Sequence, residues 1–162
     1  MSPDVPRIHR RSARVILLDD ADRLVLIRRV RTDLPERGTP VYWTTPGGGV
    51  EASDASREAA AEREAFEEAG ARVVLGPQVL LTSWRGRRGT MVNHFFLARV
   101  IDIDAARRHG PEFADEARGT LETDPLPIEE VAGIDLRPPE LRSYVVDNWP
   151  GLLSEAALLR SR

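Results

Sequence analysis

The stretch from Pro46 to Ala71, PGGGVEASDASREAAAEREAFEEAGA, joins a glycine-rich turn to an alanine-rich segment crowded with carboxylates. Residues 55–69 contain no glycine or proline and are followed by Gly70, so the pattern predicts a helix that ends at this glycine. On a helical wheel Glu64, Glu67 and Glu68 fall within an arc of about 100°. Such a run is usually a solvated acidic face, but its hard oxygens are also the ligands that Mg²⁺ and Mn²⁺ prefer.

The glycine turn and the acidic segment together resemble the Nudix box. That family pattern is glycine, five residues, glutamate, seven residues and then R-E-U-x-E-E-x-G-U, where U is a bulky aliphatic residue. Residues 63–71, REAFEEAGA, match the second half position by position, with alanine at both U positions. In the first half Gly48 is the pattern glycine if Asp54 replaces the glutamate, which leaves one extra residue before Arg63. The joint occurrence of both halves makes the resemblance specific.

The resemblance implies an α/β fold, the Nudix α/β/α sandwich with a mixed β-sheet and a loop–helix–loop motif. It also implies hydrolysis of a diphosphate linkage in a nucleoside diphosphate derivative. Glu67 and Glu68 would then be the principal metal ligands, Glu64 a ligand or the base that activates water, and Arg63 the residue that positions a glutamate. Many members use a further loop acid, for which we expect Glu116 in preference to Glu112.

Substrate contacts are expected from two places. The backbone of Gly47, Gly48 and Gly49 can approach a ligand closely because glycine has no side chain. Arginines could bind the substrate's negative charge, and Arg28 is our first choice; the wider set of candidates is Arg28, Arg29, Arg31, Arg85, Arg87 and Arg88. Trp43 and Trp84 could stack on a base, although we expect both in the core, and His94 is expected to be structural.

The flanking sequence predicts one domain over residues 1–162, with residues 1–12 as a polar lead-in. A hairpin is expected over 14–29, a loop over 30–40, a short strand over 41–46 and irregular backbone over 47–54. Beyond the helix we expect strands over 71–84 and 90–103, a loop over 104–119, a strand and a short helix within 120–131, and a helix over 138–149. The extra residue is expected to lie before the first helix, with Asp54 at or beside the N-cap.

The composition excludes several kinds of partner and reaction. The net charge of −3 gives no global basic field, so we expect no nucleic-acid and no membrane partner. Cysteine and lysine are both absent, which excludes a thiolate nucleophile, a P-loop lysine and the cysteine-dependent isopentenyl-diphosphate isomerase chemistry. No segment resembles a signal peptide or a membrane span, so a cytoplasmic protein is expected. A homodimer is possible, but the sequence does not determine the oligomeric state.

Two functions remain open at this level. The first is a hydrolase that needs Mg²⁺, with Mn²⁺ as an alternative; the second is a Nudix-fold module that senses a nucleotide without cleaving it. Retention of all three box glutamates favours the hydrolase. The segment WRGRRG (84–89) lacks the proline typical of the ADP-ribose subgroup, which leaves nucleoside triphosphates, dinucleotide polyphosphates and sugar nucleotides as substrates.

Overall fold

A computed structural model describes residues 7–31, 41–109 and 120–160 of the chain. Seven strands in these residues form one mixed sheet with the order β3-β2-β1-β6-β5, while β4 pairs with β1 and β7 pairs with β2. Among the pairings of the described strands with one another, only β1–β6 is parallel. The strands are β1 (Ile8–Leu18), β2 (Leu24–Val30), β3 (Val41–Thr44), β4 (Gly47–Gly49), β5 (Ala71–Gly86), β6 (Gly89–Ile103) and β7 (Thr120–Leu126).

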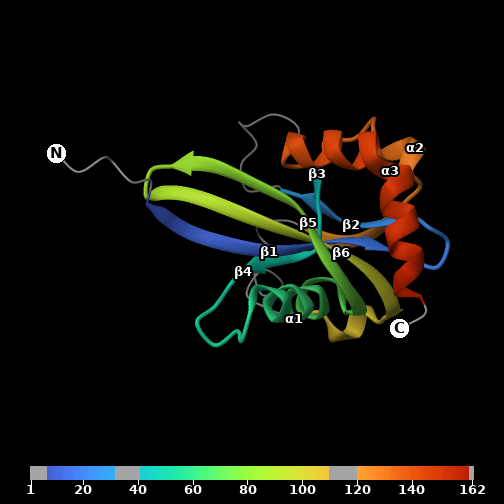
Figure 1. The fold of residues 1–162 in the computed structure, drawn as a ribbon, viewed down its shortest axis with the longest axis horizontal. Coiled ribbons are helices and arrows are strands. Elements are labelled where there is room, and N and C mark those ends of the chain that lie inside the picture. The colour runs from blue at the N-terminus through green and yellow to red at the C-terminus, as the bar shows by residue number, and fades with distance from the viewer. Residues whose placement is uncertain (1–6, 32–40, 110–119, 161–162) are drawn as a thin grey trace.

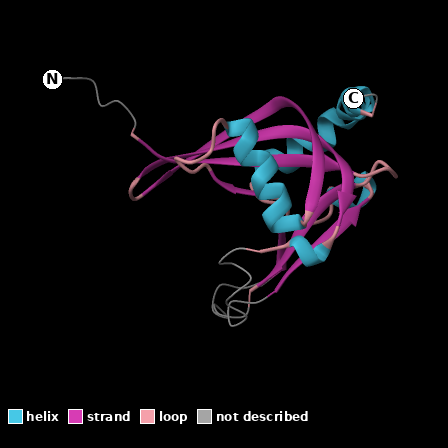
Figure 2. Cartoon of the chain, turned by 90° about the horizontal axis from the view of Figure 1, so that it is seen from below, coloured by secondary structure: helices cyan, strands magenta, loops and turns pink. Residues whose placement is uncertain are grey.

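Helices cover both faces of the sheet, as Figures 1 and 2 show. Helix α1 (Arg57–Ala69) lies on one face, and α2 (Ile128–Val131) and α3 (Pro139–Leu159) lie on the other; the short 3₁₀ helix η2 (Ala105–Arg107) follows β6. Each face has its own apolar core, because alternate residues of a strand point to opposite sides. Val15 and Leu17 pack towards α1, whereas Ile16 and Leu18 pack towards α3. The result is the predicted α/β/α sandwich.

The sheet opens between β1 and β2, and this opening positions the functional site. The two strands pair only at Leu17–Val25 and Leu18–Leu24. Beyond that point β3 continues beside β2, while β4 continues beside the first half of β1. The consecutive strands β3 and β4 therefore cross the gap, with Thr45 and Pro46 between them, and the backbone N–H of Val15 donates to the carbonyl of Pro46 at 2.9 Å.

Three expectations about the elements were wrong. Residues 8–12, expected as a polar lead-in, form the start of β1 because they pair with β6 in spite of their charges. Gly47–Gly49, expected to be irregular, form β4 on the edge that β1 presents after β2 has diverged. Helix α3 continues ten residues past the expected end at 149 and contains Pro150, and Figure 1 shows the helix bending partway along its length.

Candidate active site

Helix α1 presents the box glutamates to the sheet opening. It begins after Ser56, whose side chain accepts a hydrogen bond from the Ala59 N–H, and it ends at Gly70 in the left-handed conformation, as predicted. The helix is regular from Arg57 onwards, so the extra residue lies in the preceding loop, also as predicted. Its alanines pack against the sheet and bring Glu64 and Glu68 with them; these two residues are only 8% and 3% exposed.

Arg63 organises the carboxylates around it. Its guanidinium makes a two-point pair with Asp54, with Nε–Oδ1 at 2.8 Å and Nη2–Oδ2 at 2.9 Å. Its Nη1 donates to Glu64 at 3.0 Å and to Glu67 at 3.1 Å. The hydrogen bonds to Arg63 hold the pKa of Asp54 at about 2, below its ordinary value of 3.8, and bonding to Asp54 raises the pKa of Arg63. Asp54 is thus held as a carboxylate that fixes Arg63, and it is not the N-cap, which is Ser56.

Glu68 is held by an arginine from the sheet. Arg29 of β2 donates from Nη2 to Glu68 Oε1 at 2.9 Å, and its Nε donates to Thr44 Oγ1 at the same distance. Arg14 of β1 lies in the opening as well and donates to the Thr45 carbonyl at 3.1 Å. Burial lowers the pKa of the Arg14 guanidinium, while the nearby charge of Glu68 acts in the opposite direction.

These groups line one pocket of about 510 Å³. Its wall combines the three box glutamates with three arginines and the whole of β4: Arg10, Arg14, Arg29, Gly47, Gly48, Gly49, Val50, Glu51, Glu64, Glu67 and Glu68. The Glu64 carboxylate lies close to the backbone of Gly48, where a Cβ would be only 2.5 Å from its carboxyl carbon. A site that carries both signs of charge can hold a cation and a phosphate side by side.

A sequence model of the NUDIX domain matches residues 8–140, which is most of the chain. The chain belongs to the Nudix family. No curated protein matches the sequence closely enough to add a relative. The Nudix family comprises hydrolases that act on phosphoanhydride bonds, and its enzymes generally use divalent metal ions.

Solved Nudix structures share the fold at low sequence identity. A NUDIX hydrolase from Nitrosomonas europaea superposes with a TM-score of 0.67 and 19% identity, over 88% of this chain and 89% of that one. The MutT protein from Methanosarcina mazei Go1 gives 0.60 and 21%, over 88% and 93% of the two chains. A C. elegans Ap4A hydrolase gives 0.60 and 16%, over 90% and 98%.

The carboxylates of this Nudix site suit a hard divalent cation, and in this structure they accept hydrogen bonds from Arg29 and Arg63. Within the described ranges no three carboxylates or histidines converge closely enough to hold a metal ion. Glu64 and Glu67 nevertheless accept hydrogen bonds from the same nitrogen of Arg63, and Glu68 lines the same pocket. All three offer only oxygen atoms, the ligand type that Mg²⁺ and Mn²⁺ select. A cation at Glu68 would compete with the guanidinium of Arg29.

The arginines that line the Nudix pocket do not include Arg28, which was the first choice from the sequence. The Arg28 guanidinium carbon lies 6.0 Å from the centre of the Trp43 ring. Its neighbour Arg29 lines the pocket instead, because adjacent strand residues face opposite sides. Arg29 was in the wider set of candidates, whereas the sequence analysis missed Arg10 and Arg14. The one available signal was Arg14, an arginine next to the apolar run of β1. Glu116 and Glu112 lie outside the described residues.

The aromatic and histidine expectations had mixed outcomes. Trp43 is partly buried against the α3-side core and donates from Nε1 to Asp124 at 2.8 Å. Trp84, also expected in the core, is 58% exposed. His94 is buried and structural, with Nε2 at 3.0 Å from Arg11 Nη1 and Nδ1 at 3.0 Å from Gln78 Oε1. Arginine can only donate, so Nε2 accepts and the proton is on Nδ1; burial lowers the pKa of this imidazole.

Proposed function

We propose that this Nudix protein is a pyrophosphohydrolase that requires Mg²⁺, or Mn²⁺ in its place, and cleaves a diphosphate linkage in a nucleoside diphosphate derivative by water attack at phosphorus. The observation that carries the proposal is the composition of the pocket, which is lined by Glu64, Glu67 and Glu68 together with three arginines, Arg10, Arg14 and Arg29, and the glycine strand β4. Carboxylates alone would hold a cation, and arginines alone would hold an anion. Both together suit a phosphate that is bound along with its counter-cation.

The pocket residues have complementary tasks in this proposal. Glu67 and Glu68 supply the principal cation ligands, and Glu64 is a further ligand or takes the proton of the attacking water. A divalent cation bound there would neutralise phosphate oxygens and make the water more acidic. Arg63 holds Glu64 and Glu67 in their orientation through the contacts at 3.0 and 3.1 Å. Arg14 and Arg29 would bind phosphate oxygens, and the backbone of Gly48 and Gly49 lets the diphosphate lie close to α1.

The decisive variant is Glu67→Gln, which keeps the size of the side chain and removes its charge. Turnover of the best substrate from a nucleotide panel should fall by about two orders of magnitude or more, since a cation ligand is lost. Glu62→Gln is the matched control because Glu62 is exposed on the same helix and does not line the pocket. Circular dichroism should show equal helicity for both variants. Near-normal turnover by Glu67→Gln would exclude this assignment.

The same phosphate-release panel separates hydrolase from sensor. Nucleoside triphosphates, dinucleoside polyphosphates and nucleotide sugars are compared with Mg²⁺, with Mn²⁺ and with chelator, and binding is followed in parallel by calorimetry. Release that requires a divalent cation supports the hydrolase. Saturable nucleotide binding with no release under any condition would establish the sensing module instead.

A further inference from the structure

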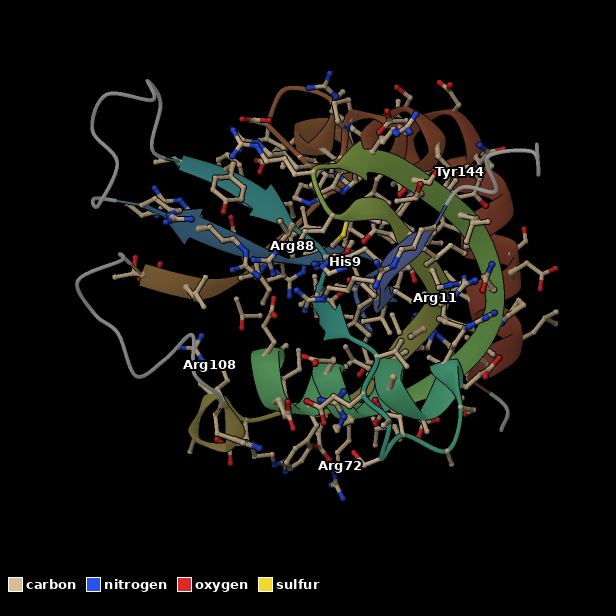
Figure 3. All side chains as sticks on the ribbon, turned by 90° about the vertical axis from the view of Figure 1, so that its left-hand side faces the viewer. His9, Arg11, Arg72, Arg88, Arg108 and Tyr144 are labelled. Carbon is tan, nitrogen blue, oxygen red and sulfur yellow. The ribbon has the colours of Figure 1, made fainter. Side chains whose placement is uncertain are left out.

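The first part of β1 and the β5–β6 hairpin form a projecting ribbon, which we call the blade and define as residues 7–14 and 79–94. Figure 1 shows it extending away from the helices, and Figure 3 views it from its end, with His9, Arg11 and Arg88 labelled. The ribbon is continuous, since Ile8 pairs with Thr90 and the Arg7 carbonyl accepts from the Thr90 N–H at 2.7 Å. Neither stretch contains an aspartate or a glutamate, and together they contain Arg7, Arg10, Arg11, Arg14, Arg85, Arg87 and Arg88.

The five exposed blade arginines lack the carboxylate partner that most exposed arginines elsewhere in the described ranges have, Arg57 being the exception off the blade. Exposed arginines off the blade lie against aspartates in four cases, namely Arg23–Asp19, Arg72–Asp102, Arg137–Asp135 and Arg160–Asp22. Across the described ranges, no carboxylate forms an ion pair with the exposed blade arginines Arg7, Arg10, Arg85, Arg87 and Arg88. The net charge of −3 therefore coexists with a local positive field on the blade, although Arg10 and Arg14 also share the pocket with the box glutamates.

An aromatic ring accompanies this charge. Trp84 precedes the hairpin turn and is 58% exposed, and its ring lies over Gly86, where a Cβ would come within 3.1 Å of it. A large exposed aromatic beside unpaired arginines is the combination that binds single-stranded nucleic acid, because bases stack on the ring and guanidinium groups pair with phosphates. A purely electrostatic surface would not require the indole.

The blade also leads into the pocket. Arg10 and Arg14 belong to both, since they lie on β1 and line the cavity that holds Glu64, Glu67 and Glu68. At a rise of about 3.3 Å per residue, the strand from Arg7 to Arg14 spans roughly 23 Å, enough to follow several successive phosphates. We propose that the blade binds a single-stranded nucleic acid whose terminal phosphates lie towards the pocket. The binding surface stands on its own; only the orientation of the strand rests on the proposed function.

The test measures binding without turnover. A 3′-labelled single-stranded RNA of about 12 nucleotides is titrated with the protein and followed by fluorescence anisotropy at several salt concentrations. Arg87→Gln with Arg88→Gln removes two turn arginines outside the pocket. Affinity should fall roughly 10- to 30-fold at about 0.1 M salt, and the slope of log K against log salt should lose about 1.4. Trp84→Ala should weaken binding about fivefold or more and leave that slope unchanged.

The matched control is Arg23→Gln with Arg137→Gln, which changes the net charge equally at exposed arginines away from the blade. An equal loss of affinity in the control and blade variants would overturn the proposal, since binding would then follow net charge alone. So would tight binding to vesicles containing phosphatidylserine without binding to the oligonucleotide, which would assign the blade to a membrane surface. Blade-dependent RNA binding by a protein that releases no phosphate from any nucleotide would uphold the surface and reject the proposed hydrolysis.

Discussion

At the scale of single residues, Arg63 holds the most connected position in the site. It reaches Asp54, Glu64, Glu67 and the Gly49 carbonyl, so one guanidinium fixes both the acidic helix and the glycine strand. Its pair with Asp54 is the shortest of these contacts at 2.8 Å, and the Asp54 side chain is only 6% exposed. We therefore regard Asp54 as the residue that positions Arg63.

Replacement of Asp54 by Asn should show this role. The amide keeps the shape but loses the charge, so Arg63 is held less firmly and Glu64 and Glu67 lose their orientation. Turnover should fall about 10- to 100-fold, the usual effect of losing a partner behind a metal ligand, with helicity unchanged. Asp54→Glu should restore part of the activity. Full activity of Asp54→Asn in steady-state kinetics would contradict the assignment.

The same carboxylate should make stability depend on pH. Asp54 has a pKa of about 2 in the folded chain and an ordinary value of 3.8, so between these values the unfolded state binds more protons. Its contribution is complete above pH 3.8 and is lost as the pH falls towards 2. Urea unfolding of the wild type and Asp54→Asn should differ at pH 6, and the difference should shrink below about pH 3.8. A difference that is constant with pH would exclude the ion pair as its source.

Residue types were easier to predict than the direction of their side chains. The resemblance implied that Arg63 positions a glutamate, and its i,i+4 spacing from Glu67 brings these two side chains together on the helix. Arg28 was chosen in place of Arg29 because the choice depends on which face of β2 meets α1, and that is set by packing remote in sequence. The Asp54–Arg63 pair was missed because Asp54 lies in a loop, whose path no periodic pattern specifies.

At the scale of elements, the glycines of β4 leave room for the side chains that pack against this strand. A Cβ on Gly48 would approach the Glu64 carboxylate oxygens to 2.6 Å, well inside contact distance. Gly48→Ala should displace either the carboxylate or the strand and lower turnover by more than about tenfold, because catalytic geometry tolerates little misplacement. Gly133→Ala is the control, since its Cβ would find no atom nearer than 3.8 Å. Equal turnover by both variants would show that β4 can accommodate the methyl group without disturbing the site.

Helix α1 depends on its first turn. Ser56 Oγ accepts from the Ala59 N–H at 3.0 Å and satisfies one of the free donors there. Ser56→Ala should lower the free energy of unfolding by about 1 kcal/mol in urea denaturation. Ser53→Ala, at an exposed loop position three residues earlier, should change it by less than half as much. If the two variants lose equal stability, the cap is not the cause.

The ends of helices and strands were predicted well where the residues at the end set it, and poorly where pairing with a strand distant in sequence sets it. Gly70 ends α1 as predicted, whereas the N-cap is Ser56 and the expectation of Asp54 at or beside the N-cap was wrong. The start of β1 at Ile8 depends instead on β6, more than eighty residues later, and arginines there concealed the strand. Helix α3 continues through Pro150 because Leu152, Ala156 and Leu159 still find the core beyond the proline.

At the scale of the whole molecule, Arg99 connects distant parts of the chain. Its buried guanidinium donates to the Ala156 carbonyl in α3, to the Asp19 carbonyl at 3.0 Å and to Asp22 at 3.2 Å. The β1–β2 turn is thereby bound to the C-terminal helix. No helix in the described ranges is both long and apolar enough to cross a membrane.

Arg99→Met should remove the hydrogen bonds between the β1–β2 turn and helix α3. The thioether fills much of the space but leaves the carbonyl acceptors unsatisfied, so the free energy of unfolding should fall by about 1–3 kcal/mol. Arg23→Met, at an exposed arginine in the same turn, should have little effect. Chemical denaturation measures both, and hydrogen exchange should show faster opening of the last turns of α3 only in Arg99→Met. A stable Arg99→Met protein would mean that apolar packing alone holds this helix.

The parallel pairing of β1 with β6 has a consequence for synthesis. Until β6 has left the ribosome, β1 can pair only with β4 and with the first residues of β2, at Ser12–Arg14 and Leu17–Leu18. Contacts so distant in sequence form slowly. Strand β1 is thus made before β6 but completed only with it, and a nascent chain halted before Gly89 would expose the apolar residues of β1 to chaperones.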